Sequence, residues 1–331
     1  MNESSSIIIQ IVPRDINAGP INVAKDLIMG LTSAGLKSEI YCLRNRDGKR
    51  LFCNFIRLIK IVKNKKNFIL HSHGVVPDLV CFILSFIFKF KWISTVHADP
   101  KEDLKFIYPK TYGFICFVWN SLLKKADTVV YLTEYIYSKQ NLKNKKFIHN
   151  SRLIVEKSLV KIANFSTQRK IGFCGVLIER KNIRALVTST LSNSGYFLTI
   201  AGDGPLKTEL QSITNLSEQI NFLGHQDDLT YFWNEIDILV LPSFAEGVPL
   251  AAIEAIARGI PLILMNLNNY KNIFTESESV FISTLSNTSL NQSVETIYNN
   301  YDSYHNNAIK AYNERFDFNN WISQYKEVYF D

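Results

Sequence analysis

The sequence predicts an α/β protein with two doubly wound domains, each built on a parallel sheet. Short apolar runs alternate with helical patterns through both halves of the chain, as in successive β-α-β units. The 331-residue length favours two domains, and a hydrophobic content of 47% is enough for a large buried core. The composition therefore does not fit a disordered chain.

Ten apolar runs predict the buried strands. In the first half they are Ile7–Val12, Ser38–Leu43, Phe68–His71, Trp92–Val96 and Thr128–Leu132. In the second half they are Lys170–Cys174, Phe197–Ala201, Ile220–Leu223, Asp237–Leu241 and Pro261–Leu264. The Asn/Ser/Thr-rich stretch 266–293 predicts surface loops interrupted by one strand. The tail from Tyr301 to Asp331 is helical in pattern and rich in aromatics, so its apolar face must pack on another element.

The charge is distributed unevenly between the two halves. Residues 1–165 hold 26 Lys+Arg and 12 Asp+Glu, a net charge of +14, whereas residues 166–331 hold 11 and 18, a net charge of −7. The short polar segment Ala163–Arg169 coincides with this change and is the predicted linker. A basic half indicates an anionic partner, which could be a nucleic acid, a membrane surface or a phosphorylated acceptor, or only a solvated surface.

Several classes of protein do not fit the sequence. No RNP-like aromatic motif, zinc-finger spacing or recognition helix argues for nucleic-acid binding. The five cysteines are odd in number and sit among apolar neighbours without a metal-ligand spacing, which indicates buried thiols in a reducing compartment.

The N-terminus lacks the pattern of a signal peptide, so we expect a cytoplasmic protein. The apolar run Leu79–Phe88 is too short to span a bilayer and predicts a buried helix.

The segment Ile236–Ile263 is the most informative part of the chain. It reads as a buried strand, a loop and a helix over about Pro249–Arg258, ended by Gly259. A loop between a parallel strand and a helix points backbone N–H groups toward the crevice where anionic ligands bind. Glu246 in the loop and Glu254 in the almost wholly apolar helix frame this place. Because a carboxylate accepts hydrogen bonds from vicinal hydroxyls, a sugar or ribose is a sensible ligand.

The letters EGVPLAAIEAIARGIPLI resemble the E-x7-E segment of the family-4 retaining glycosyltransferases, with Glu246 and Glu254 at the glutamate positions. The resemblance implies that Glu246 contacts hydroxyls of the donor sugar and that Glu254 binds the ribose of the nucleotide. The resemblance also implies that Gly247, Val248 and Pro249 belong to the donor-binding loop. The family usually has Phe where this chain has Val248, a change that alters the shape of the donor pocket.

IGFCGVLIERKNI resembles the family's strand followed by Gly-Arg-Leu-x-x-x-Lys, matched by Gly175, Leu177 and Lys181. Lys181 would then neutralise the donor diphosphate and stabilise it as the leaving group. Val176 stands at the family's arginine position, so one of two expected cations is missing and Arg180 is the candidate substitute.

Further matches cover most of the chain. LTIAGDGPLKTEL resembles the family's strand and Gly-x-Gly-Pro turn, which places Gly202 near the donor, and INFLGHQDDLTYFWNEID resembles the segment near the nucleotide base. In the first half, Gly19 occupies a loop that the family keeps close to the donor phosphates, although Pro20 removes one N–H donor. His97 aligns with a histidine that lies beneath the donor sugar, whereas His71 and His73 favour a structural role.

The resemblance implies a GT-B fold with two Rossmann-like domains facing across a cleft. The predicted domains are an acceptor-side domain (1–165), on which a C-terminal helix (about 317–331) packs back, and a nucleotide-sugar-binding domain (166–316). The implied activity moves a hexosyl or N-acetylhexosaminyl group, most simply from a UDP-sugar, with retention of configuration and without a metal or other cofactor. The implied acceptor is a lipid-linked or oligosaccharide glycan of O-antigen, lipopolysaccharide, capsule or exopolysaccharide. We expect peripheral association with the anionic inner face of the cytoplasmic membrane.

Other functions stay open at this point. A GT-B-like sugar-nucleotide epimerase would turn over its donor without any acceptor. A degenerate glycosyltransferase acting as a binding subunit would explain Val176 and Pro20, but Glu246, Lys181 and His97 argue against it. No lysine motif for a pyridoxal cofactor supports a phosphorylase, and no G-x-G-x-x-G motif supports a nicotinamide oxidoreductase.

Overall fold

The computed structural model describes residues 6–15, 19–154, 168–214 and 217–331 of the chain. The chain divides into two compact units, which are described separately: unit 1 is Met1–Leu153 with Asp317–Asp331, and unit 2 is Ile154–Phe316. The predicted boundary between residues 165 and 166, and the predicted linker up to residue 167, lie outside the described residues. Both units are α/β and carry one parallel sheet, as the sequence predicts.

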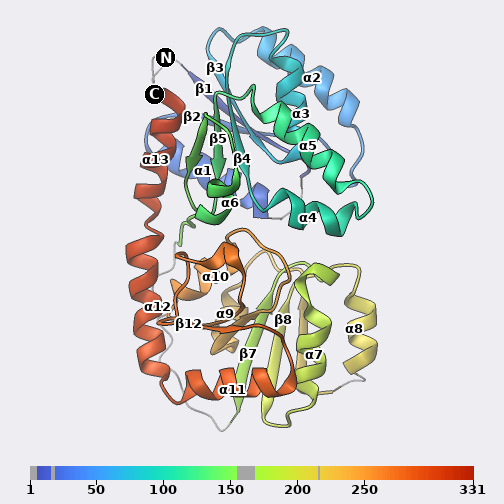
Figure 1. Ribbon diagram of the computed structural model, residues 1–331, viewed down its shortest axis with the longest axis vertical. Coiled ribbons are helices and arrows are strands. Elements are labelled where there is room, and N and C mark those ends of the chain that lie inside the picture. Colours follow the sequence, from blue (N-terminus) through green and yellow to red (C-terminus); the bar gives the residue numbers. More distant parts are fainter. Residues whose placement is uncertain (1–5, 16–18, 155–167, 215–216) are drawn as a thin grey trace. The chain divides into compact units, whose positions relative to one another are not determined.

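Unit 1 has a six-stranded sheet in the order β2-β1-β3-β4-β5-β6. The strands are β1 (Ile7–Val12), β2 (Lys37–Cys42), β3 (Phe68–His73), β4 (Lys91–Val96), β5 (Thr128–Tyr131) and β6 (Lys145–Phe147). The helices are α1 (Gly19–Ser33), α2 (Leu51–Lys63), α3 (Val75–Leu84), α4 (Pro100–Ile107), α5 (Tyr112–Leu123), α6 (Glu134–Lys139) and α13 (Phe318–Phe330). Helices α1 and α13 cover one face of the sheet, and α2, α3 and α5 cover the other (Figure 1).

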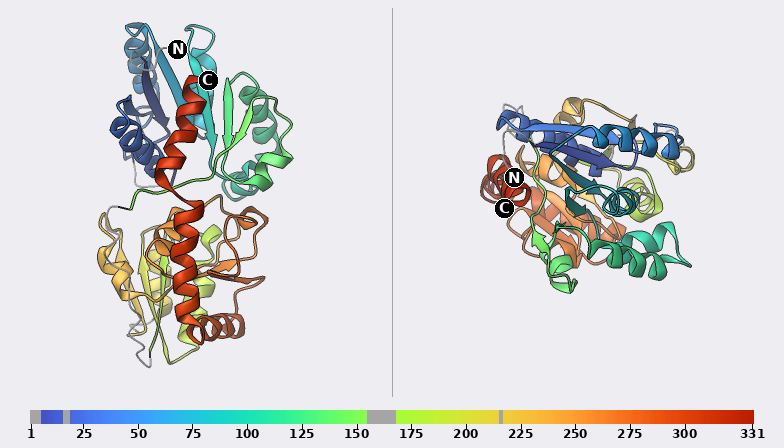
Figure 2. Two further views of the ribbon diagram at one scale, coloured as in Figure 1. Left: turned by 90° about the vertical axis from the view of Figure 1, so that its left-hand side faces the viewer. Right: turned by 90° about the horizontal axis from the view of Figure 1, so that it is seen from above.

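The register of the first sheet brings polar side chains together on the face covered by α13. Gln10 on β1 is paired with His71 on β3, and His73 on β3 is paired with Thr95 on β4. Because successive residues of a strand point to opposite faces, His71 and His73 share a face of the sheet. Three parallel strands therefore present a polar row beneath the C-terminal helix, which Figure 2 shows crossing the sheet.

Helix α13 reaches this face because α1 leaves room for it. A Cβ atom on Gly30 of α1 would lie 2.2 Å from Cδ1 of Ile322 on α13, so a larger residue here would force the Ile322 side chain to move. The side chains of Trp321, Tyr325 and Tyr329 on α13 are buried. The aromatic face predicted for the tail thus packs on unit 1.

The helical tail consists of two helices, and the second lies where the C-terminal helix at about 317–331 was expected. Helix α12 ends at Arg315, and α13 starts again at Phe318, where the Asp317 side chain accepts a hydrogen bond from the N–H of Asn320 at 2.6 Å. An aspartate at this position satisfies backbone donors that the first turn of a helix leaves without partners. The first helix belongs to unit 2 and the second to unit 1.

The prediction that Leu79–Phe88 is a buried helix is wrong in part. Helix α3 ends at Leu84, and four apolar side chains of the run, those of Leu79, Ile83, Phe86 and Ile87, are exposed. A helix that packs on a sheet buries only the side chains that face the strands. The run has apolar side chains on all sides, so some of them point to solvent. The prediction of buried thiols also fails at Cys53, which is exposed on α2.

Unit 2 has a six-stranded sheet in the order β12-β11-β10-β7-β8-β9. The strands are β7 (Arg169–Cys174), β8 (Tyr196–Ala201), β9 (Ile220–Gly224), β10 (Ile238–Leu241), β11 (Leu262–Met265) and β12 (Ser279–Ile282). The helices are α7 (Ile183–Leu191), α8 (Lys207–Thr214), α9 (Thr230–Glu235), α10 (Leu250–Ile256), α11 (Asn287–Tyr298) and α12 (Tyr301–Arg315), with 3₁₀ turns at Glu179–Lys181 and Asn268–Tyr270. Helix α7 packs against α8 and α11, and α10 packs against α12.

Helix α10 is shorter at both ends than the predicted 249–258 helix. Pro249 precedes it in an extended conformation, and Gly259 has a φ of +72°. The N–H of Ile260 donates to the carbonyl of Ala255 at 3.0 Å, which closes the helix with the turn that a left-handed glycine allows. A Cβ on Gly259 would also collide with the ring of His305 on α12. The end of this helix is therefore fixed by backbone geometry and by packing.

Candidate functional site

The strand order of unit 2 reverses between β7 and β10. The chain runs from β7 through β8 to β9 on one side, then returns to place β10 on the other side of β7. In open α/β sheets, ligands bind outside the carboxyl ends of the strands at such a switch point. The loops that leave β7 and β10 here carry Gly175, Arg180, Lys181 and Glu246. The topology thus brings together residues that the sequence separates by about 65 positions.

Glycines let the loop after β7 pack on the loop after β8. Gly175 and Gly202 have φ angles of +156° and +151°, and a Cβ on Gly202 would lie 1.9 Å from the carbonyl oxygen of Gly175. A Cβ on Gly204 would similarly meet the backbone of Leu177. The N–H of Leu177 donates to the carbonyl of Asp203 at 3.0 Å. Gly202 is therefore required where the loop after β8 crosses the loop after β7, and its predicted contact with a donor stays a prediction.

Glu246 forms the centre of a charged cluster. The ammonium of Lys181 donates a hydrogen bond to Oε1 of Glu246, and Nη1 of Arg180 lies 3.4 Å from Oε2. All three side chains are largely buried, with exposed fractions of 8% for Glu246, 14% for Lys181 and 18% for Arg180. Burial alone disfavours the charged form of Glu246, but the two cations outweigh it and lower the pKa of the carboxyl. The cluster carries one net positive charge.

The backbone around this cluster is held from three loops. The guanidinium of Arg180 donates to the carbonyl of Ala245, and the N–H of Phe244 donates to the carbonyl of Arg180 at 2.9 Å. The Asn269 side chain donates to the carbonyl of Glu246 at 2.6 Å. Arg180 therefore lies in the same cluster as Lys181 and Glu246, and its role as the substitute for the arginine that Val176 replaces stays a prediction.

Two residues near Glu246 were not found from the sequence. Asn269 and Tyr270 lie in the 3₁₀ turn after β11, within the stretch that was predicted to be surface loops, yet both are buried. Burial and the neighbouring Glu246 carboxylate raise the pKa of the Tyr270 hydroxyl, so this group stays neutral. Both residues follow the predicted strand Pro261–Leu264 within a few positions, and this place in the loop after a buried strand could have drawn attention to them.

Glu254 is on α10 and is buried, with 9% of its surface exposed. The loop residues Gly247 and Val248 are also buried, and Pro249 is partly exposed at the start of the helix. The structure thus places Glu246 in the loop after β10 and Glu254 on the helix that follows this loop, at the switch point. Their predicted roles toward ribose and sugar stay predictions.

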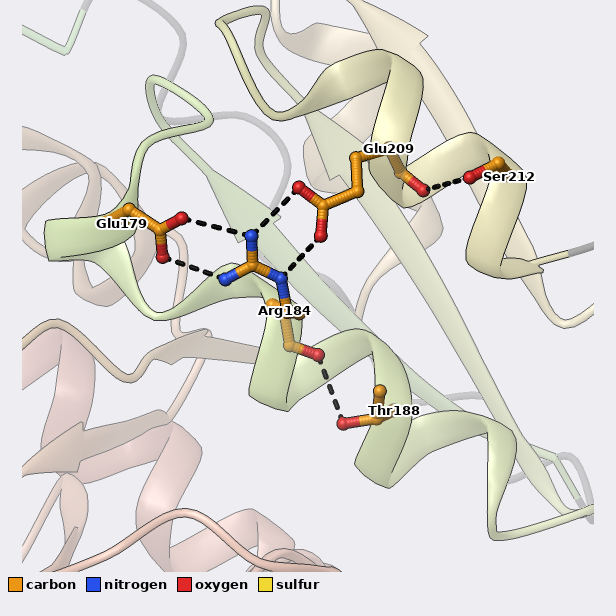
Figure 3. A network of polar contacts seen from close by, with 5 residues as sticks. All are labelled: Glu179, Arg184, Thr188, Glu209 and Ser212. Carbon is orange, nitrogen blue, oxygen red and sulfur yellow. Dashed lines mark hydrogen bonds and ion pairs between the residues drawn. The ribbon is translucent and has the colours of Figure 1, made fainter.

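An exposed ionic network fastens the 3₁₀ turn that carries Arg180 and Lys181. The guanidinium of Arg184 donates to both carboxylate oxygens of Glu179, at 2.8 and 3.0 Å, and to both of Glu209, at 2.7 and 2.8 Å (Figure 3). Bidentate pairs of this kind fix geometry more than single contacts do. The network ties Glu179 to α8 and so restrains the turn just before Lys181.

In unit 1, the predicted residues lie at the carboxyl ends of β1, β3 and β4. His97 follows β4 directly and is partly exposed, while His71 and His73 are fully buried at the end of β3. Burial lowers the pKa of His71 and of His97 to about 3, so both rings are neutral. Gly19 is the exposed first residue of α1, whereas residues 16–18 before it lie outside the described part of the chain.

Two kinds of feature are absent from the described residues. No group of three or more His, Cys, Asp or Glu side chains there is arranged to hold a metal ion. Within the same residues, no helix combines the length and apolar character needed to cross a membrane.

Residues 155–314 match the family model described as glycosyl transferases, group 1. The chain is a glycosyltransferase. This glycosyltransferase is 25% identical over 282 residues to the O-antigen biosynthesis glycosyltransferase WclY of Escherichia coli, a match that covers 78% of the chain and 79% of WclY. The family and the relative agree with the resemblance based on Glu246, Glu254 and Lys181.

The glycosyltransferase also resembles solved GT-B structures along almost its whole length. Sucrose-phosphate synthase from Thermosynechococcus elongatus aligns with a TM-score of 0.81 at 17% identity, covering 98% of each chain. HepE from Anabaena, solved in complex with UDP, aligns with a TM-score of 0.74 at 14% identity, covering 97% of this chain and 98% of HepE. These likenesses confirm the predicted fold of two Rossmann-like domains.

Proposed function

We propose that this glycosyltransferase moves a sugar from a UDP-sugar to a glycan acceptor during assembly of a bacterial surface polysaccharide. The observation that carries the proposal is the cluster of Glu246, Lys181 and Arg180 at the switch point of unit 2. An anionic nucleotide suits a site with net positive charge, and hydroxyl groups suit an ionised carboxylate. The O-antigen role of the relative WclY supports the polysaccharide pathway, and the UDP complex of HepE supports the nucleotide.

In the proposed reaction, Lys181 and Arg180 bind the diphosphate of the donor. They become most effective as the bond to the sugar breaks, because negative charge then accumulates on the leaving group. Glu246 holds hydroxyls of the sugar, and Glu254 holds those of the ribose. The acceptor attacks from the face that the diphosphate leaves, which retains the configuration. The positive charges of Lys181 and Arg180 take the place of a divalent metal. We therefore expect sugar transfer to continue when EDTA is added.

Glu254→Ala is expected to weaken binding of UDP by at least about tenfold, since a hydrogen bond to a charged group contributes roughly 1.5–3 kcal/mol. Isothermal titration with UDP measures the affinity directly. Glu235→Ala, which changes a glutamate on α9 that pairs at 3.8 Å with Lys170, is the control and should bind UDP like the wild type. Equal UDP affinity in Glu254→Ala and in the wild type would contradict the ribose assignment.

We also propose that unit 1 binds an anionic membrane, where a lipid-linked acceptor would be available. Large apolar side chains are exposed on α2, on α3 and the turn after it, and on α5: Phe52, Ile56, Leu79, Ile83, Phe86, Ile87, Phe114 and Phe117. Residues 49–125 contain fourteen Lys+Arg and four Asp+Glu. The ammonium of Lys125 lies 5.5 Å from the ring centroid of Phe86, so basic and aromatic groups are interleaved as on interfacial helices.

Binding to vesicles that contain phosphatidylglycerol is expected to be abolished by charge reversal of Lys60, Lys63, Lys65 and Lys66 on or just after α2. Each cation near an anionic leaflet contributes about 1 kcal/mol and is screened within about 8 Å at physiological salt, so added salt should weaken wild-type binding as well. Co-sedimentation measures the bound fraction, and unchanged UDP affinity of the variant shows that unit 2 is intact. A wild type that ignores anionic vesicles at low salt would rule out the membrane proposal.

A further inference from the structure

Two side chains of unit 2 hold the peptide bonds on either side of Glu246. The guanidinium of Arg180 donates to the carbonyl of Ala245, which belongs to the peptide before Glu246. Nδ2 of Asn269 donates at 2.6 Å to the carbonyl of Glu246, which belongs to the peptide that joins Glu246 to Gly247. A carbonyl oxygen only accepts, so the group of Asn269 that faces it is the amide nitrogen. Arg180 and Asn269 therefore fix the backbone from which the Glu246 carboxylate extends.

Asn269 belongs to a turn that is itself held in place. It lies in the 3₁₀ turn after β11, and β11 pairs in parallel with β10, so the loops after these two strands leave the sheet at the same edge. Asn269 is only 2% exposed, whereas Asn268, the residue before it in the turn, is exposed. The carbonyl of Tyr270 accepts from the N–H groups of Ile273 and Phe274, at 3.0 and 3.1 Å. Asn269 thus contacts Glu246 from a fixed position inside unit 2.

The hydrogen bond from Asn269 also sets the direction of the Gly247 N–H. A trans peptide is planar, so its C=O and its N–H point in opposite directions. The N–H of Gly247 makes no hydrogen bond to any described residue, so it remains available to a ligand. Without the amide of Asn269 this peptide could turn over, since glycine accepts the backbone angles of either orientation. The amide therefore selects one of two orientations of the peptide that follows Glu246.

We propose that Asn269 is a positioning residue for the transferred sugar, because it holds the Glu246–Gly247 peptide so that the Gly247 N–H and the Glu246 carboxylate present a donor and an acceptor to the hydroxyls of that sugar. The sugar contact rests on the proposed function, in which Glu246 binds the donor sugar. A hydroxyl both accepts and donates, so it is satisfied by an N–H and a carboxylate together. If the peptide turned over, a carbonyl oxygen would replace the N–H, and the hydroxyls would meet acceptors alone.

The orientation of this peptide is tested by NMR of one labelled bond. The sequence contains a single Glu-Gly pair, Glu246–Gly247, so protein made with ¹³C-carbonyl glutamate and ¹⁵N-glycine has one doubly labelled peptide. In Asn269→Ala we expect the carbonyl signal to move upfield, because its oxygen loses a hydrogen bond, and the amide signal to broaden or split. Asn268→Ala is the matched control: it removes an exposed asparagine from the same turn and should leave both signals unchanged. An unchanged carbonyl signal in Asn269→Ala would overturn the inference even in an active enzyme.

Kinetics test what this orientation does for sugar transfer. Asn269→Ala is expected to lower kcat about tenfold with unchanged UDP affinity, because the sugar contact strengthens in the transition state and UDP has no sugar to make it. Asn269→Leu keeps the branched shape of the side chain without its donor and should behave alike, whereas Asn268→Ala should keep wild-type kcat. Wild-type kcat in both Asn269 variants, or a loss of UDP affinity as large as the loss of kcat, would overturn the positioning role. A wild type that binds UDP but transfers no sugar would instead contradict the proposed function.

Discussion

Lys181→Ala is expected to lower kcat for sugar transfer by about 10²–10³-fold, the loss typical of removing one group that stabilises charge in a transition state. The residue contacts Glu246 in a largely buried cluster, where electrostatic interactions are stronger than in water. Arg180 still pairs with Glu246 in the variant, so the carboxylate keeps one cation. Steady-state kinetics with a UDP-sugar and a glycan acceptor measure the effect.

Lys207→Ala provides the control for the removal of a lysine. Its ammonium lies 2.9 Å from the exposed carboxylate of Asp203, on the neighbouring loop and helix of unit 2. Exposed pairs contribute little, so kcat of this variant should match the wild type. Arg180→Ala should fall between the two, because its guanidinium lies 3.4 Å from Glu246 and also holds the backbone at Ala245. An equal kcat in Lys181→Ala and Lys207→Ala would remove Lys181 from the mechanism.

The strands that carry the fold could be predicted from the sequence because they are apolar and regularly spaced. The predicted run Ile7–Val12 agrees with β1, and the other nine predicted strands each overlap an observed strand. Strand β6, with the letters KKF, was not predicted, since it lies at the edge of the sheet and is mostly solvent-exposed. Edge strands that face water need no apolar run, so hydropathy gives no signal for them.

The candidate site was predicted only as far as local motifs extend. Glu246 and Lys181 stand next to recognisable glycines and strands, but their direct contact depends on β10 lying beside β7. The long-range order of strands is not encoded in any local pattern, and the same holds for Asn269. In unit 1, the sequence favoured structural roles for His71 and His73. The structure shows that His73 and Gln10 connect His97 to Tyr329, a residue more than 200 positions away in the chain, and that His71 contacts Tyr329 directly.

Arg315→Ala is expected to destabilise unit 2 by about 3–5 kcal/mol, because it leaves a buried carboxylate without its cation. Glu278 is fully buried, and Nη2 of Arg315 donates to its Oε1 at 2.7 Å. The same guanidinium donates from Nη1 to the carbonyl of Ile273 at 2.8 Å. The main-chain N–H and the hydroxyl of Thr275 also donate to Glu278, so the carboxylate is held on several sides.

Calorimetry should therefore show a transition of Arg315→Ala that is lower by roughly 10 °C, since each kcal/mol shifts Tm by about 2–4 °C in a domain of this size. Lys310→Ala on the same helix is the control: Lys310 lies 3.9 Å from Glu314 in an exposed pair, and its loss should change stability by about 0.5 kcal/mol or less. Adding Glu278→Gln to Arg315→Ala removes the unpaired charge and should restore part of the stability. If the charge of Glu278 contributed nothing, the double variant would melt no higher than Arg315→Ala, and the loss would have to come from the contact with Ile273 alone.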